Sequence, residues 1–138
     1  MPFLTRNEDE GLMTNETYER GLALRKEVLG EDYVARSFAN ADEFSRPMQE
    51  LSTEYCWGNV WSRDGLSRRD RSLLNIGMIS ALNRPHELKL HVKAALTNGL
   101  SRDEIREALL QVAIYCGVPA GLDSTRIARE AFAELDAA

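Results

Sequence analysis

The chain has 138 residues, of which 43% are hydrophobic and 28% charged, and its formal net charge is −5. This length suits a single domain, and the composition is ordinary for a soluble globular protein. The negative charge disfavours a general nucleic-acid-binding protein, which usually carries a basic face. It does not exclude a small anionic ligand, because a few arginines can outweigh the net charge locally.

The two cysteines, Cys56 and Cys116, are far apart in the chain and form no disulfide framework, which suits a reducing compartment. The N-terminal stretch MPFLTRNEDEG is acidic and lacks an apolar signal core. The longest uncharged run, residues 108–122, is too short to span a bilayer. We therefore expect a cytoplasmic protein with no membrane span, in which residues 1–13 form a loose or docking arm before a helical domain at 14–138.

The first predicted helix begins at Asn15, a good N-terminal capping residue, and Gly30 is placed to end it. A short helix is expected at about 32–38. The segment from about 41 to 61 also has a helical pattern, and Gly58 is expected to end or bend it. The first half of the chain is therefore predicted to contain helices and loops only.

The strongest predicted helix begins at Ser67, after a loop, and ends before Asn83-Arg84-Pro85. Residues 73–81 of this helix are apolar almost all round, which is typical of a helix at the centre of a core. Pro85 suits the first turn of the next helix, which should end at Asn98-Gly99.

Ser101 and Glu104 form a full capping box, which predicts the start of another helix. The stretch Val118-Pro119-Ala120-Gly121 is expected to be a turn, after which Asp123 or Ser124 caps a last amphipathic helix. No segment shows the alternation of a strand. The sequence therefore predicts an all-α single domain with about six to seven helices.

Both histidines lie in the stretch HELKLH, residues 86–91. It is one residue too long for the zinc motif H-E-x-x-H, so His86 and His91 point in different directions on a helix. No third histidine is available to complete a site, and no metal is expected. Glu87 and His91 share a helix face. The carboxylate there should orient the imidazole and raise its pKa, making a general acid, unless the two are only a surface pair.

The stretch from Trp57 to Ala120 resembles the 4-carboxymuconolactone decarboxylases of the protocatechuate branch of the β-ketoadipate pathway. The likeness extends from about residue 18 to residue 132. The most specific pieces, which are strong together in this order, are Trp57-Gly58 with Trp61, Arg71-Ser72-Leu73, Glu87-Leu88-Lys89-Leu90-His91, Asn98-Gly99 and Ile114-Tyr115-Cys116-Gly117-Val118-Pro119.

This resemblance implies the helical fold of the alkylhydroperoxidase-like proteins, assembled as homo-trimers or homo-hexamers with sites close to subunit contacts. The peroxidase branch of that superfamily carries Cys-x-x-Cys-x-x-x-His on the equivalent helix. If His91 takes the place of that histidine, Arg84 and Glu87 stand where the two cysteines would be. Thiol–disulfide chemistry is therefore excluded at this position.

The resemblance also implies a small anionic lactone as substrate, with no metal or organic cofactor. His91 is expected to donate a proton, or to donate to the lactone oxygen, with Glu87 orienting it; the alternative is that His91 only holds a helix end in the oligomer. An arginine side chain can bind a carboxylate through two parallel hydrogen bonds. Arg71 matches the family motif and is the first choice as the substrate's cationic partner, followed by Arg68 and Arg84.

Trp57 and Trp61 are expected either to form an apolar wall for the departing carboxylate or to pack in a core or interface. Tyr115 is a candidate donor to the lactone oxygen. Cys116 is expected to be a small buried hydrophobe, and Cys56 to be inert.

Some positions depart from the family pattern. Cys56 stands where a small residue such as alanine is usual, Asn59 and His86 stand where acidic residues are common, and Asp64 replaces a common proline. These differences leave open a related lactone or carboxylic acid as the substrate. A non-catalytic oligomeric protein that binds a small molecule is a further alternative.

Overall fold

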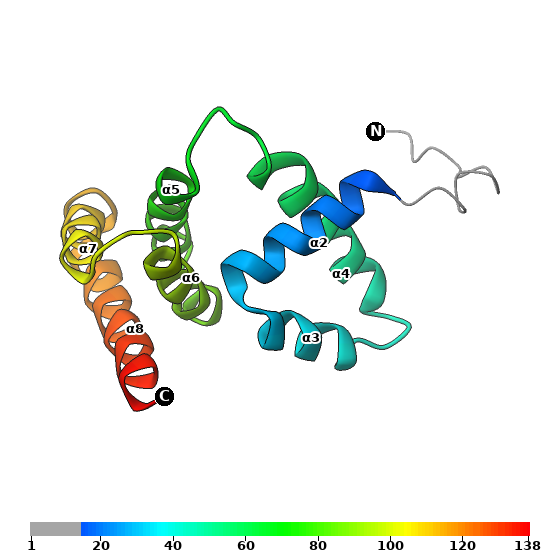
Figure 1. Cartoon of the computed structure of the whole chain (residues 1–138). Coiled ribbons are helices and arrows are strands. Elements are labelled where there is room, and N and C mark those ends of the chain that lie inside the picture. Colours follow the sequence, from blue (N-terminus) through cyan, green and yellow to red (C-terminus); the bar gives the residue numbers. More distant parts are fainter. Residues whose placement is uncertain (1–14) are drawn as a thin grey trace. The chain divides into compact units, whose positions relative to one another are not determined.

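The structure is a computed structural model that describes residues 15–138, and these residues form helices joined by short loops, with no strand (Figure 1). The predicted all-α class is therefore confirmed for the described part of the chain. The expected arm at 1–13, and its boundary with the helical domain, lie outside the described residues. Within residues 15–138, no helix has both the length and the apolar character needed to cross a membrane.

The chain divides into two compact units, one ending at Arg63 and the other formed by Asp64–Ala138. The described residues of the two units form seven α-helices and one π-helix. In the first unit these are α2 (Glu16–Leu29), α3 (Glu31–Ala39), α4 (Arg46–Leu51) and the π-helix η1 (Ser52–Trp61). In the second unit they are α5 (Arg68–Ala81), α6 (Pro85–Thr97), α7 (Arg102–Cys116) and α8 (Val118–Ala137).

Polar side chains cap three of these helices as the sequence predicts. Asn15 accepts a hydrogen bond from the backbone N–H of Tyr18, at the start of α2. Ser67 begins α5 in the same way. At the start of α7, Ser101 and Glu104 form both halves of the capping box. These side chains satisfy N–H groups that the first turn of a helix leaves without a backbone partner.

Glycines allow α2 and η1 to cross with their backbones almost in contact. A Cβ atom on Gly21 would lie 2.0 Å from the carbonyl oxygen of Thr53, and one on Gly58 would lie 2.3 Å from that of Thr17. No side chain fits at such distances, so only glycine permits this approach. The prediction that Gly58 could end its helix is wrong, because η1 continues to Trp61. The glycine is required there for packing.

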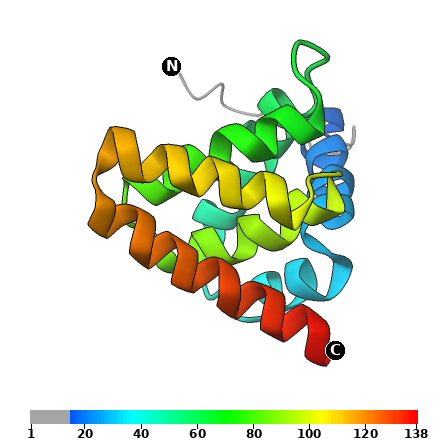
Figure 2. The same ribbon diagram turned by 90° about the vertical axis from the view of Figure 1, so that its left-hand side faces the viewer.

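The predicted turn at 118–121 is wrong. α8 begins directly after Gly117, whose φ of 107° lies in the left-handed region and reverses the chain in one residue. Pro119 lies in the first turn of α8, where its missing N–H group costs nothing. Asp123 and Ser124 therefore lie inside α8 rather than capping it. Figure 2 shows the result, with α8 running back alongside α7.

The core of the second unit is an aliphatic cluster contributed by all four of its helices. Its buried members are Ile76, Leu88, Val92, Ala95, Leu100, Ile105, Leu109, Ile127, Ala128 and Ala131. The expectation that α5 is buried almost all round is wrong for this chain. Ile76 is fully buried, but Leu74 is 54% exposed and Met78 is 47% exposed. One face of α5 therefore packs in the core, and another presents apolar side chains to the surface.

Candidate functional site

The candidate site lies in the second unit, where His91 of α6 packs against α5. Nδ1 of the His91 ring is 3.5 Å from Nδ2 of Asn75, which lies near the middle of α5. Both side chains are half-buried. Sequence reasoning missed Asn75. The one available signal was an amide within the otherwise apolar run of residues 73–79, because a polar group there needs a partner.

Burial decides the charge of His91. Loss of hydration lowers the pKa of His91 below 6.5, and the carboxylate of Glu87 opposes this shift by its charge without reversing it. The prediction that His91 has a raised pKa is therefore wrong for the net effect, although the expected influence of Glu87 has the right sign. Glu87 itself is exposed. At neutral pH the ring is uncharged, so it can donate one hydrogen bond and accept another.

Arg71 and Arg68 precede Asn75 on α5 by one and two turns. Their spacing of three and then four residues places all three on one face of the helix. Arg71 is half-buried, whereas Arg68 is exposed at the first position of α5. The face of α5 that carries the His91 contact therefore also carries positive charge.

Arg69, the neighbour of these two residues, has a different role. Its guanidinium forms ion pairs with Asp70, at 4.0 Å, and with Glu104 of α7. These contacts make Arg69 part of a surface ion-pair network. Such exposed pairs contribute little to stability, typically about 0–1 kcal/mol. Arg69 is therefore a useful comparison for Arg71, since both carry the same charge on the same helix.

Arg84 lies in a separate hollow of the second unit. The hollow has a volume of about 210 Å³, and its lining includes Arg84, Ser80, Asp123 and Arg126, but not His91. The Arg84 guanidinium donates to the carbonyl oxygen of Leu82 at 3.3 Å. Asp123 and Glu130 hold Arg126 at 3.7 Å and 3.1 Å. The mixed charge of this hollow suits a dianion less well than the Arg71 face of α5 does.

Tyr115 lies at the end of α7 and is 82% exposed. It belongs to a set of exposed apolar and aromatic side chains that we call the α7–α8 apolar face, which consists of Leu110, Ile114, Tyr115, Val118 and Leu122. Cys116 is also exposed, so the prediction of a small buried hydrophobe is wrong. α7 turns into α8 at Gly117, and this places both side chains at the surface of the unit.

Trp57 and Trp61 lie in the first unit, where their rings stack at 4.7 Å with an interplanar angle of 22°. They are 3% and 6% exposed. Such burial is typical of core residues and favours packing over a substrate wall. Loss of hydration raises the pKa of the nearby Cys56 thiol, which disfavours the reactive thiolate.

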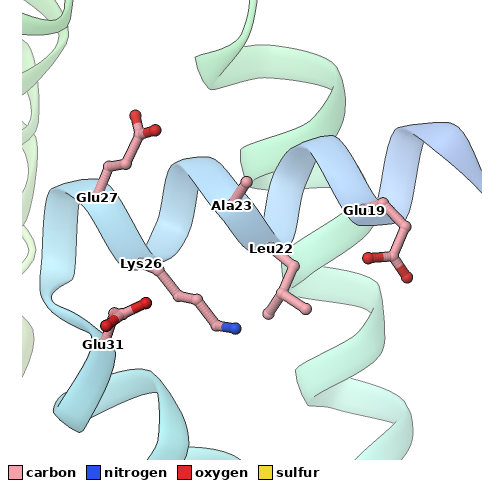
Figure 3. Close-up of a pocket in the computed structure, with 6 residues that line it drawn as sticks. All are labelled: Glu19, Leu22, Ala23, Lys26, Glu27 and Glu31. Atoms are coloured by element: carbon pink, nitrogen blue, oxygen red, sulfur yellow. The ribbon is translucent and has the colours of Figure 1, made fainter.

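The first unit also has a hollow of about 400 Å³ along α2 (Figure 3). Its rim includes the carboxylates of Glu19, Glu27 and Glu31, together with Lys26. None of the predicted site residues lines it, and its excess of negative charge disfavours an anionic ligand. Among residues 15–138, no three histidine, cysteine or carboxylate side chains gather as potential metal ligands.

Comparisons with known proteins agree with the resemblance seen in the sequence. Residues 46–130 match the model of the carboxymuconolactone decarboxylase family. The chain is 42% identical over 118 residues to the 4-carboxymuconolactone decarboxylase of Acinetobacter baylyi, which covers 86% of this chain and 88% of that protein. It is 47% identical over 107 residues to the nitrosuccinic acid decarboxylase of Metarhizium robertsii, which covers 78% and 75% of the two chains.

A pH titration of the His91 ring, followed by NMR, tests the electrostatics of the site. We expect a pKa below 6.5, and a further decrease in Glu87→Gln, because that substitution removes the carboxylate whose charge raises the pKa of His91. At pH values between the lower pKa of the folded state and 6.5, the His91 ring binds a proton in the unfolded chain but not in the folded one. The contribution of His91 to the free energy of unfolding is therefore present above pH 6.5 and is lost as the pH falls toward the folded pKa. A His91 pKa above 6.5 would contradict this picture.

Proposed function

The chain belongs to the carboxymuconolactone decarboxylase family, and we propose that this carboxy-lyase converts 4-carboxymuconolactone to 4-oxoadipate enol-lactone in the breakdown of protocatechuate. The likeness to a 4-carboxymuconolactone decarboxylase over 86% of the chain supports this substrate. The observation that carries the proposal is the contact of His91 with the face of α5 that bears Arg71. A dianionic lactone requires such a combination of a cation and a neutral donor.

The reaction needs no cofactor, because the substrate contains its own electron acceptor. When the carboxylate on the γ-carbon leaves as CO2, the electron pair of the broken C–C bond moves through the ring double bond into the lactone carbonyl. The product of this step is a dienolate, with negative charge on the carbonyl oxygen of the lactone. Addition of a proton at the α-carbon then gives the enol-lactone. The protein has to bind the dianion, stabilise the dienolate and allow this protonation.

Each role can be assigned to a residue of the second unit. Arg71 binds the carboxylate that stays in the product, with Arg68 adding positive charge at the start of α5. Neutral His91 donates a hydrogen bond to the carbonyl oxygen of the lactone as negative charge develops there. The departing carboxylate must be held loosely, because tight binding of the ground state would slow the reaction.

Nitrosuccinate is a second candidate substrate, because the chain is 47% identical to a nitrosuccinic acid decarboxylase. In that molecule the nitro group is attached to the carbon that bears the departing carboxylate. The electron pair therefore moves into the nitro group, and a second carboxylate remains. The same residues suit both acids, since decarboxylation of each places negative charge on an oxygen conjugated with the reacting carbon and leaves one carboxylate in the product. The departures at Cys56 and Asn59 are compatible with either substrate.

We also propose that the protein is a homo-oligomer, a trimer or hexamer. The α7–α8 apolar face and the exposed Leu74 and Met78 of α5 give the second unit more surface apolar side chains than solubility favours. Burying them between copies would remove this surface from water. Light scattering combined with size exclusion should give three or six times the mass of the chain. A monomer in that measurement would contradict the assembly, and with it any contribution of a neighbouring subunit to the site.

The proposed function is tested by CO2 release from freshly made 4-carboxymuconolactone and from nitrosuccinate. We expect turnover of the lactone by the wild type, and a loss of about 10²-fold or more in His91→Ala, which is the scale for an acid–base or oxyanion-binding residue. His86→Ala is the matched control, since His86 is exposed on the same helix. Arg71→Gln should raise KM strongly, whereas Arg69→Gln should not, because Arg69 lies off the face of α5 that carries Arg71 and Asn75 and is directed to Glu104 of α7.

Each alternative outcome would contradict a different part of the proposed function. Equal rates for wild type and His91→Ala would leave the reaction standing and remove His91 from it. Turnover of nitrosuccinate alone would select the second candidate substrate. No release of CO2 from either acid by folded protein would overturn the proposed substrates and favour a related acid or a non-catalytic binding protein.

A further inference from the structure

The partner of His91 Nδ1 determines which ring nitrogen is available to a ligand. Asn75 Nδ2 of α5 is 3.5 Å from Nδ1 of the His91 ring. The separation is at the long end for a hydrogen bond. Contacts at active sites are often long without substrate and shorten when it binds. With Nδ1 occupied by Asn75, Nε2 is the nitrogen left for the substrate.

The two possible orienting groups make opposite demands on the imidazole. A carboxylate such as that of Glu87 can only accept, so it would hold the proton on Nδ1. The amide nitrogen of Asn75 can only donate, so it requires Nδ1 to be the unprotonated nitrogen. The single proton of the neutral ring is then on Nε2. The identity of the orienting residue therefore decides whether the substrate meets a hydrogen-bond donor or an acceptor.

We propose that Asn75 is a positioning residue that holds His91 in the Nε2–H tautomer, so that the ring presents a hydrogen-bond donor to the oxyanion formed on decarboxylation. This inference rests on the proposed function for its chemical meaning, but the tautomer is a property of the protein alone. Glu87 acts on the pKa of His91 through its charge, whereas Asn75 determines which ring nitrogen carries the proton. A donor at Nε2 stabilises an oxyanion, whereas an acceptor there would repel it.

A second amide between the same two regions gives a matched control. Asn98, the residue that ends α6, donates from Nδ2 to Ser72 Oγ of α5 at 2.9 Å. Asn98→Leu removes one polar contact of α5, as Asn75→Leu does, but leaves the surroundings of His91 intact. Both substitutions should lower the free energy of unfolding, because each removes one polar contact between α5 and the α6 region. Only the change at Asn75 should alter the ring.

The experiment records the nitrogen NMR shifts of the imidazole in protein labelled with ¹⁵N-histidine. His86→Gln serves as the background, so that His91 is the only histidine. At a pH where the ring is neutral, we expect Nδ1 to show the shift of an unprotonated nitrogen and Nε2 that of a protonated one. Asn75→Asp should exchange the two shifts, because its carboxylate accepts from Nδ1. Asn75→Leu should give a mixture, and Asn98→Leu should match the background protein.

The activity of the same variants separates positioning from folding. Asn75→Asp and Asn75→Leu should lower kcat by tenfold or more with little change in KM, since the lost interaction is made mainly in the transition state. Asn98→Leu should keep kcat near that of the background.

A proton on Nδ1 in the background protein would overturn this inference, and would mean that the Asn75 amide is turned so that Oδ1 faces the ring. Unchanged nitrogen shifts in Asn75→Asp would overturn it as well. The expected shifts together with no CO2 release would contradict the proposed function instead, and would leave the tautomer assignment standing.

Discussion

The packing of α5 against α6 removes water from the His91 ring, and the proposed chemistry depends on this effect. An exposed imidazole next to the carboxylate of Glu87 would be expected to gain a proton more easily than usual. Burial outweighs that charge and lowers the pKa of His91, so the ring is neutral at the pH of a cell. A neutral imidazole can bind an oxyanion through one nitrogen while the other is held in place. The structure therefore favours a hydrogen-bond donor over a preformed acid.

The same helix pair explains how a chain with a net charge of −5 can select an anion. Several carboxylates elsewhere in the second unit are paired with cations, and Glu134, for example, accepts from both Lys89 and Lys93. Those two partners lower the pKa of Glu134 to about 2. Arg71 shares a face of α5 with the residue that contacts His91. In the proposed function, binding of a dianion is therefore a local property of one helix face, which the total charge does not exclude.

The helix boundaries could be predicted from the sequence where the signal is local. Ser101 with Glu104 and Asn98-Gly99 act within one turn, and α7 and α6 begin and end where these residues indicate. Gly117 followed by Pro119 was ambiguous, since the pair suits a turn and also the first turn of a helix. The structure adopts the second possibility, and α8 begins about two turns earlier than predicted as a result.

The candidate site was only partly predictable, because its decisive interactions join residues distant in the sequence. The spacing of Glu87 and His91 correctly places them on one face of a helix, but spacing carries no information on how deeply α5 buries the ring. Asn75 is sixteen positions from His91, so only the register of α5 against α6 brings them together. The same limit applies to Trp57 and Trp61, whose burial is a property of the fold.

The pH dependence of kcat/KM for CO2 release is the most direct test of the claim that neutral His91 is the active form. The rate should be constant above pH 7 and should fall as the pH decreases through the His91 pKa, below 6.5. In Glu87→Gln this fall should move to lower pH, because the charge that raises the pKa is gone. A rate that increases on acidification through the same range would mean that the imidazolium is the active form, and would contradict the account.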